Sequence, residues 1–288
     1  MAEKDLSEKI LESHNDVFAD IINGFFYKGE QVISPDELTD HFSISSFSDK
    51  GKLRSQERDV SKLWIKGKFT IACIGVENQS KVEANMPLRI MAYDGGEYKR
   101  QANNHSAHPY PVITLVLYFG KRPWHRPRSL FERLTIDPKL KPFVNDYKIN
   151  IFDVSHMSQK QVINFSSDFK IIADYFAQLN ATGEYIPSTI PIKHPVDTGE
   201  MLKYVTGDNR FESLLCSEKG GINNMYDAFA AAEKRGETRG EARGEAKGEA
   251  RGIELAKKLI ALGRISDLER AADNEAFRNQ LFKEFALQ

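Results

Sequence analysis

Cysteine is scarce in this chain of 288 residues, which contains only Cys73 and Cys216. Two cysteines far apart cannot form the disulfide framework of a small secreted domain or a cysteine-rich zinc site. Cys73 lies in an apolar stretch, where a cysteine packs as a small buried side chain. Disulfide-stabilised and zinc-ribbon classes are therefore excluded.

The chain also lacks long hydrophobic runs and a large net charge. No run approaches the roughly 20 apolar residues of a transmembrane helix, and the N-terminus lacks the apolar core of a signal peptide. We therefore expect a cytoplasmic protein without a membrane partner. The net charge of −1 provides no overall attraction to nucleic acid, so contact with a polyanion requires local basic patches.

Motifs for nucleotide and nucleophilic chemistry are absent as well. The sequence has no Walker-type glycine-rich loop, no nucleophile elbow and no histidine cluster at metal-ligand spacing. His105 and His108 lie in a loop rich in Pro and Asn, which favours surface positions over metal ligation. A nucleotide cofactor is not expected.

Hydrophobic periodicity predicts an α/β fold. Apolar residues recur at helical spacing in three segments, and four others have the composition of strands. The helices are expected at residues 7–27, 85–101 and 160–179, and the strands at 59–64, 69–79, 112–119 and 148–154. Residues 36–57 are expected to form a polar connection, and short helices are expected at 197–206 and 222–233. This order predicts a mixed central sheet flanked by helices, with one antiparallel hairpin.

Two acids mark the ends of the predicted hairpin. Asp59 begins its first strand, and Glu77 lies at the polar end of the second, where Gln79 shares its face. A loop of three to five residues would bring Asp59 opposite Glu77, whereas a two-residue turn at 66 and 67 would pair Asp59 with Ile74. If the carboxylates meet, they can hold a hard divalent cation. Otherwise they are ordinary polar strand ends.

The C-terminal part begins with a charged repeat at residues 235–252, where Arg-Gly-Glu-Ala and close variants recur every four residues. Like charges at i,i+4 oppose an isolated helix, and each Gly costs about 1 kcal/mol relative to Ala. The segment is therefore either a flexible spacer or a helix whose glycines allow two chains to approach closely. Helices expected at 253–262 and 267–285 would form a module for self-association or, alternatively, a helix-turn-helix reader.

These segments suggest a domain plan. It comprises a core at residues 1–190, a helical extension at 191–234, the repeat as a linker or helix at 235–252, and a C-terminal helical module at 253–288. A homo-oligomer is expected to form through the last of these regions.

Several short motifs together resemble a known family. Asp16-Val17-Phe18, Arg58-Asp59-Val60, Glu77-Asn78-Gln79, Met86-Pro87-Leu88-Arg89 and Tyr118-Phe119-Gly120 with Pro123-Trp124 resemble, in order and spacing, the Rpn family of recombination-promoting nucleases and putative transposases. That family belongs to the PD-(D/E)XK nuclease superfamily. The resemblance covers about residues 10–235 and implies a metal-dependent DNA endonuclease.

The resemblance also implies a site. Asp59 and Glu77 match the two acids that hold the metal, with Mg²⁺ as the expected ion, and Asp16 matches an acid on the first helix that would be an accessory ligand. Gln79 stands where most of the superfamily has Lys. The Glu-x-Gln pattern of residues 77–79 nevertheless resembles the pattern of the Rpn family itself. Gln can orient water or a phosphate oxygen only through neutral hydrogen bonds, so slower turnover or help from a cation such as Lys81 is expected.

Basic residues near this site are candidates for contacts with the DNA backbone, which carry no sequence information. They are Lys81, Arg89, Lys121, Arg122, Arg126 and Arg128. Arg89 would share a helix face with Tyr93, which is expected in the core. Two other functions stay open: a catalytically degenerate nuclease fold that binds DNA, and a scaffold that assembles through its repeat and terminal helices.

Overall fold

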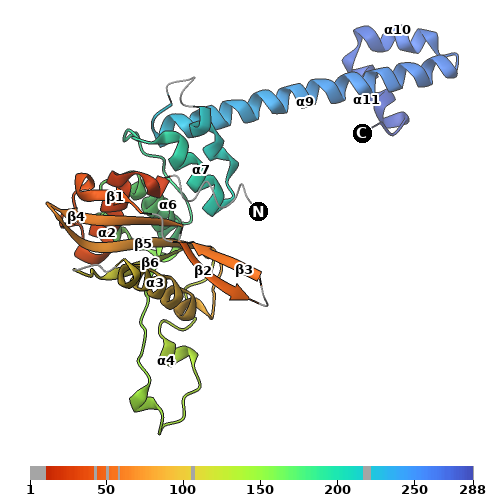
Figure 1. The fold of residues 1–288 in the computed structure, drawn as a ribbon. Coiled ribbons are helices and arrows are strands. Elements are labelled where there is room, and N and C mark those ends of the chain that lie inside the picture. Colours follow the sequence, from red (N-terminus) through yellow and green to blue (C-terminus); the bar gives the residue numbers. More distant parts are fainter. Residues whose placement is uncertain are drawn as a thin grey trace. The chain divides into compact units, whose positions relative to one another are not determined.

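The computed structural model describes residues 11–41, 44–49, 52–57, 59–104, 108–216 and 222–287. Arg58 and His105, both considered above, lie outside the described residues. The chain divides into two compact units, Met1–Phe229 and Ala230–Gln288. Figure 1 shows the elements of each.

A five-stranded mixed sheet forms the centre of the first unit, in the order β1-β4-β5-β6-β7. The strands are β1 (Leu38–Asp40), β4 (Val60–Lys66), β5 (Phe69–Gln79), β6 (Val112–Tyr118) and β7 (Asn150–Asp153). β1, β4 and β5 pair antiparallel, whereas β5, β6 and β7 pair parallel. The predicted mixed α/β sheet with one antiparallel hairpin is therefore confirmed.

The prediction that residues 36–57 form a polar connection was wrong. It contains the edge strand β1 and a separate two-stranded antiparallel sheet of β2 (Ile44–Asp49) and β3 (Lys52–Glu57). Edge strands and small hairpins bury little apolar surface, so their sequences carry a weak hydrophobic pattern.

Helices cover both faces of the five-stranded sheet (Figure 1). The longer ones are α2 (Asn15–Tyr27), α3 (Met86–Asn103) and α6 (Phe169–Thr182), whereas α7 (Pro195–Thr206) packs on other helices, including α6. Shorter turns are η1 (Pro35–Glu37), α4 (Leu130–Arg133), η2 (Lys141–Phe143), η3 (Val154–His156), α5 (Gln159–Val162) and η4 (Asn209–Cys216).

The alternation of strand side chains separates two hydrophobic cores. On one face, Ile74 and Val76 of β5 pack in the same cluster as Phe18 of α2 and Phe169 of α6. On the other face, Val116 of β6 packs with residues of α3. Since Leu115 and Leu117 join the first core and Val116 and Tyr118 the second, β6 is covered on both sides, as its continuous apolar sequence predicts.

The helix predicted at 160–179 is interrupted by a turn. Asp20, a buried residue of α2, accepts hydrogen bonds from the backbone N–H and the hydroxyl of both Ser166 and Ser167, at 2.7 to 3.0 Å. The backbone N–H groups that Asp20 binds precede α6, so this carboxylate ties α2 to the entry of α6. A sequence pattern cannot show this because the two segments are about 146 residues apart.

A buried carboxylate on α3 makes the stability of the first unit depend on pH. Glu97 is fully buried and accepts hydrogen bonds from His41, Arg100 and Tyr110. Burial alone would raise the pKa of Glu97, but these hydrogen bonds outweigh it and hold that pKa well below its usual range. Burial and the bond to Glu97 also raise the pKa of Tyr110 to about 12.

The lowered pKa of Glu97 predicts a loss of stability in acid. A depressed folded-state pKa contributes stability above the unfolded-state pKa of 4.5 and loses it as the pH falls toward the folded value. Urea unfolding at pH values from about 5.5 down to about 3.5 should therefore show a shallower decline for Glu97→Gln than for wild type. The exposed Glu184→Gln is the control. Equal slopes for wild type and Glu97→Gln would refute the assignment.

The second unit contains the C-terminal helices, the first of which begins shortly before residue 230. Helix α9 (Met225–Ala261) carries the whole charged repeat, and α10 (Ile265–Asp273) and α11 (Glu275–Glu284) follow it. Leu255 and Leu259 of α9 form a small core with Ala271, Leu281 and Leu287. The helical alternative for the repeat thus matches the structure, although nothing lies within 4 Å of the Cβ positions of its glycines. Self-association through this module stays a prediction. None of the described helices is long and apolar enough to cross a membrane.

Candidate active site

The hairpin of β4 and β5 brings Asp59 and Glu77 together. Lys66 pairs with Phe69, so the turn has two residues, Gly67 and Lys68, with Gly67 at a φ of +61°. Such a turn alone would place Asp59 opposite Val76. A bulge between Trp64 and Ile65 shifts the register by one residue, so that Val60 pairs with Val76 and Asp59 comes opposite Glu77. Both acids therefore come to the same end of the hairpin and line one cavity, through a bulge and not through a longer loop.

Hydrogen bonding fixes this arrangement. The Oδ2 atom of Asp59 accepts the backbone N–H of Asn78 at 2.8 Å. Glu77, the neighbour of Asn78, is fully buried on the face of the sheet that α3 covers. The pair therefore consists of a half-buried acid held by the opposite strand and a second acid that is fully buried.

Asn78 connects the hairpin to a third acid on the other face of the sheet. Its Nδ2 donates to Oε2 of Glu12 at 2.8 Å, and Glu12 is fully buried. Sequence reasoning missed Glu12. The available signal was an acid directly beside Leu11, within the apolar spacing of the first helical segment.

Arg89 of α3 lies inside the site. Its guanidinium forms an ion pair with Oε1 of Glu77, and its Nε donates to the hydroxyl of Tyr93 at 3.0 Å. Tyr93 is buried, as expected. The Oε2 atom of Glu77 has no hydrogen-bond partner among the residues that the structure describes. Thus one positive charge faces Glu77 while half of its carboxylate is unsatisfied.

These groups line a polar cavity of about 680 Å³, which we call the hairpin cavity. Its lining residues are Asp59, Glu77, Asn78, Gln79, Ser80, Lys81, Val82, Glu83, Ala84, Arg89, Arg126 and Tyr204. Lys81, Arg89 and Arg126 are three of the predicted DNA-binding residues. Tyr204, from α7, was not predicted, because nothing in the sequence places residue 204 beside residue 77.

The remaining predicted DNA-binding residues lie outside this lining. Lys121, Arg122 and Arg128 are exposed in the segment that follows β6. That segment is fastened at Trp124, whose backbone N–H donates to Asp153 at 3.0 Å and whose ring packs edge-on against Tyr118. Contact between these three side chains and DNA stays a prediction.

The structure does not bring Asp16 to Asp59 and Glu77. Asp16 lines a different cavity, of about 310 Å³, and contacts Lys193 at 2.9 Å and His194 at 3.2 Å. Although burial would raise it, these hydrogen bonds lower the pKa of Asp16 below its ordinary value. Glu12, not Asp16, is the first-segment acid that is connected to the hairpin.

The protein thus has a mixed α/β fold with two acids that line one polar cavity. Residues 39–179, from β1 into α6, match the model of the family described as putative transposase, YhgA-like. This match confirms the resemblance to the Rpn and putative transposase family, and it includes both Asp59 and Glu77. Comparisons with curated proteins and with solved structures gave no match.

Proposed function

We propose that this protein is a metal-dependent DNA endonuclease with a PD-(D/E)XK-type core, which hydrolyses phosphodiester bonds. The observation that carries the proposal is that Val60 pairs with Val76 at the end of the hairpin, so that the neighbouring Asp59 and Glu77 both line the hairpin cavity. The family match supports a transposase-like or nuclease-like role.

The side chains of the cavity fit a hard divalent cation. Asp59, Glu77 and the Gln79 amide supply oxygen donors, which are the ligands that Mg²⁺ prefers. The unsatisfied Oε2 atom of buried Glu77 favours a cation, since a buried carboxylate without compensation is costly. Asp59 and Glu77 would hold Mg²⁺, which when bound neutralises phosphate charge and lowers the pKa of its water.

The cations of the cavity would position the substrate. Lys81 and Arg126 line the same cavity and can bind phosphate oxygens, which orients a DNA strand without reading its sequence. Gln79 would orient water or a phosphate oxygen through neutral hydrogen bonds. Because strand alternation puts it on the face of Glu77, it would act beside the acids.

The ion pair between Arg89 and Glu77 favours a second candidate function. The guanidinium of Arg89 provides the positive charge that a metal would otherwise supply to Glu77. A chain that keeps this ion pair permanently would be a degenerate nuclease fold that binds DNA without cutting it. In an active enzyme, the metal would bind the Oε2 atom of Glu77, which Arg89 does not occupy.

Cleavage of supercoiled plasmid tests the proposal. Purified full-length protein is incubated with Mg²⁺ or with EDTA, and the double variant Asp59→Ala/Glu77→Ala, prepared identically, controls for contaminating nucleases. Nicking that requires Mg²⁺ and disappears in the double variant supports the endonuclease. DNA binding without nicking under all conditions would favour the degenerate fold, and nicking by the double variant would exclude the site.

A further inference from the structure

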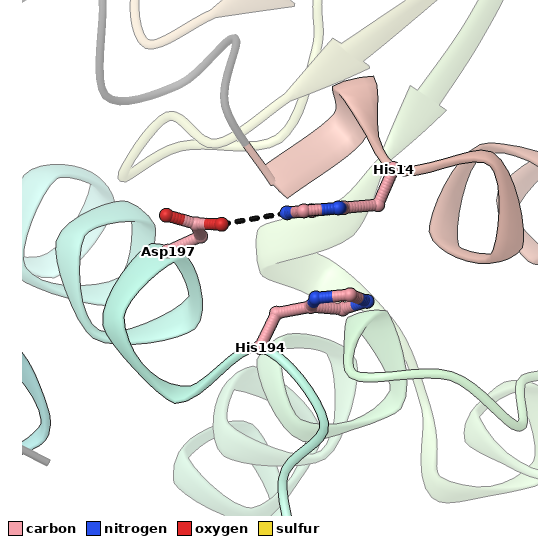
Figure 2. Close-up of side chains that lie close together, drawn as sticks. All are labelled: His14, His194 and Asp197. Carbon is pink, nitrogen blue, oxygen red and sulfur yellow. Dashed lines mark hydrogen bonds and ion pairs between the residues drawn. The ribbon is translucent and has the colours of Figure 1, made fainter. Parts of the chain in front are cut away.

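Three side chains outside the hairpin cavity form a second group of metal-ligand type. His14, at the start of α2, lies beside His194 and Asp197, at the start of α7 (Figure 2). One ligand atom from each lies within 4.8 Å of the others. We propose that His14, His194 and Asp197 bind a divalent transition-metal ion of the Zn²⁺ class, independently of the hairpin cavity.

The donor set suits such an ion. Two imidazole nitrogens and one carboxylate oxygen form a three-ligand set of the kind that Zn²⁺ accepts, whereas Mg²⁺ and Ca²⁺ prefer oxygen ligands. The three side chains are 33%, 16% and 23% exposed, in the order His14, His194 and Asp197. An ion can therefore reach them from solvent.

Asp16 holds one ring of the group in the orientation of a ligand. Both carboxylate oxygens of Asp16 lie 3.2 Å from Nε2 of His194. A histidine that binds a metal commonly donates its other ring N–H to a carboxylate, which fixes its tautomer. A hydrogen bond from Nε2 to Asp16 leaves Nδ1 of His194 as the nitrogen for the ion.

Backbone contacts hold His194 in place. Buried Asp168 accepts the backbone N–H groups of Lys193 and His194, at 3.0 and 2.6 Å. Lys193 also pairs with Asp16, so its charge is directed to that carboxylate. With one negative charge on Asp197 and the pair of Asp16 and Lys193 balanced, the local charge favours a divalent cation.

The two imidazole rings must separate and tilt before they can close around an ion. The two imidazole rings are stacked, with centroids 3.7 Å apart and planes inclined by 14°, and Nε2 of His14 is 2.6 Å from Oδ2 of Asp197 (Figure 2). Ligand atoms around tetrahedral Zn²⁺ lie roughly 3.3 Å apart, and the ion lies near the plane of each ring. The rings would therefore have to part and rotate until their planes meet at the ion, while the contact between His14 and Asp197 would lengthen by less than about 1 Å.

Zn²⁺ titration of the full-length protein, in competition with a chromophoric chelator, tests the proposal. We expect one equivalent to bind, with the affinity reduced at least about tenfold in His14→Ala, His194→Ala and Asp197→Asn. Asp16→Asn should weaken binding less. Co²⁺ should give the visible absorption of a low-symmetry site, which the histidine variants lose.

Two controls separate this site from others in the chain. His156→Ala removes a histidine that also pairs with an aspartate, at 2.7 Å, and should retain Zn²⁺ binding. Asp59→Ala/Glu77→Ala removes the acids of the hairpin cavity and should also retain it. Circular dichroism verifies the fold of each variant, with His194→Gln as a milder alternative to His194→Ala. The proposal would be overturned if wild type did not bind Zn²⁺ or if the His14 and His194 variants bound it as wild type does. Loss of Zn²⁺ binding in Asp59→Ala/Glu77→Ala would overturn it as well.

Discussion

Glu77→Gln is expected to lower the rate of Mg²⁺-dependent plasmid cleavage by about a thousandfold, because a lost metal contact removes several kcal/mol of transition-state stabilisation. Gln keeps the shape of the side chain but not its charge. Buried Glu77 has Arg89 as its ion-pair partner, so the variant also leaves that guanidinium without a carboxylate. Initial rates of nicking and urea unfolding are therefore measured on the same preparation.

A matched control distinguishes a metal ligand from general negative charge in the cavity. Glu83 lines the same cavity, but it lies in the loop after β5 and is not paired with Asp59. Glu83→Gln should retain cleavage within about threefold of wild type, whereas Asp59→Asn should resemble Glu77→Gln. Equal losses in Glu83→Gln and Glu77→Gln, or activity in Glu77→Gln near that of wild type, would contradict the assignment.

Asp20→Ala is expected to lower the free energy of unfolding by about 3–5 kcal/mol, because it strips the charged acceptor from a buried hydrogen-bond network. The substitution leaves the backbone N–H groups of Ser166 and Ser167 without this acceptor at the entry of α6. Equilibrium urea unfolding, followed by circular dichroism, measures the loss.

Asp16→Ala, one helical turn before Asp20, is the matched control for that experiment. Asp16 pairs with Lys193, whose side chain is 67% exposed, and with the ring of His194, and it is itself 28% exposed, so its loss should cost less than that of buried Asp20. Asp20→Asn, which keeps one carbonyl acceptor, should fall between wild type and Asp20→Ala. A loss in Asp20→Ala no larger than that in Asp16→Ala would show that the network does not hold α6.

The main strands were predictable from the sequence because their signal is local. The stretch at residues 69–79 corresponds to β5, and the continuous apolar run from residue 112 corresponds to β6. Each contains a run of mostly apolar residues that packs against helices on one or both faces. Strands β1, β2 and β3 lack such a segment, so the sequence did not reveal them.

The composition of the site was only partly predictable. Asp59, Glu77 and Gln79 belong to one hairpin, so their spacing pointed to a shared edge. The bulge that brings the two acids to the same end arises because Ile71 is an extra residue between the pair of Trp64 with Ala72 and the pair of Ile65 with Thr70. No local sequence pattern specifies where such an extra residue falls. Glu12 and Tyr204 come from segments far along the chain, and only the packing of helices on the sheet brings them close.

The sequence separation between the contacting residues differs between the two sites, and this difference bears on how the chain folds. The contact between Asp59 and Asn78 closes a loop of 19 residues, whereas that between His14 and Asp197 spans 183. Closing the longer loop from an unstructured chain costs about 2 kcal/mol more in entropy. The contact at Asp59 needs only one hairpin, whereas we expect that between His14 and Asp197 to form after the intervening sheet. A probe at His14 would therefore report the completion of folding, and a probe at Asp59 would report its beginning.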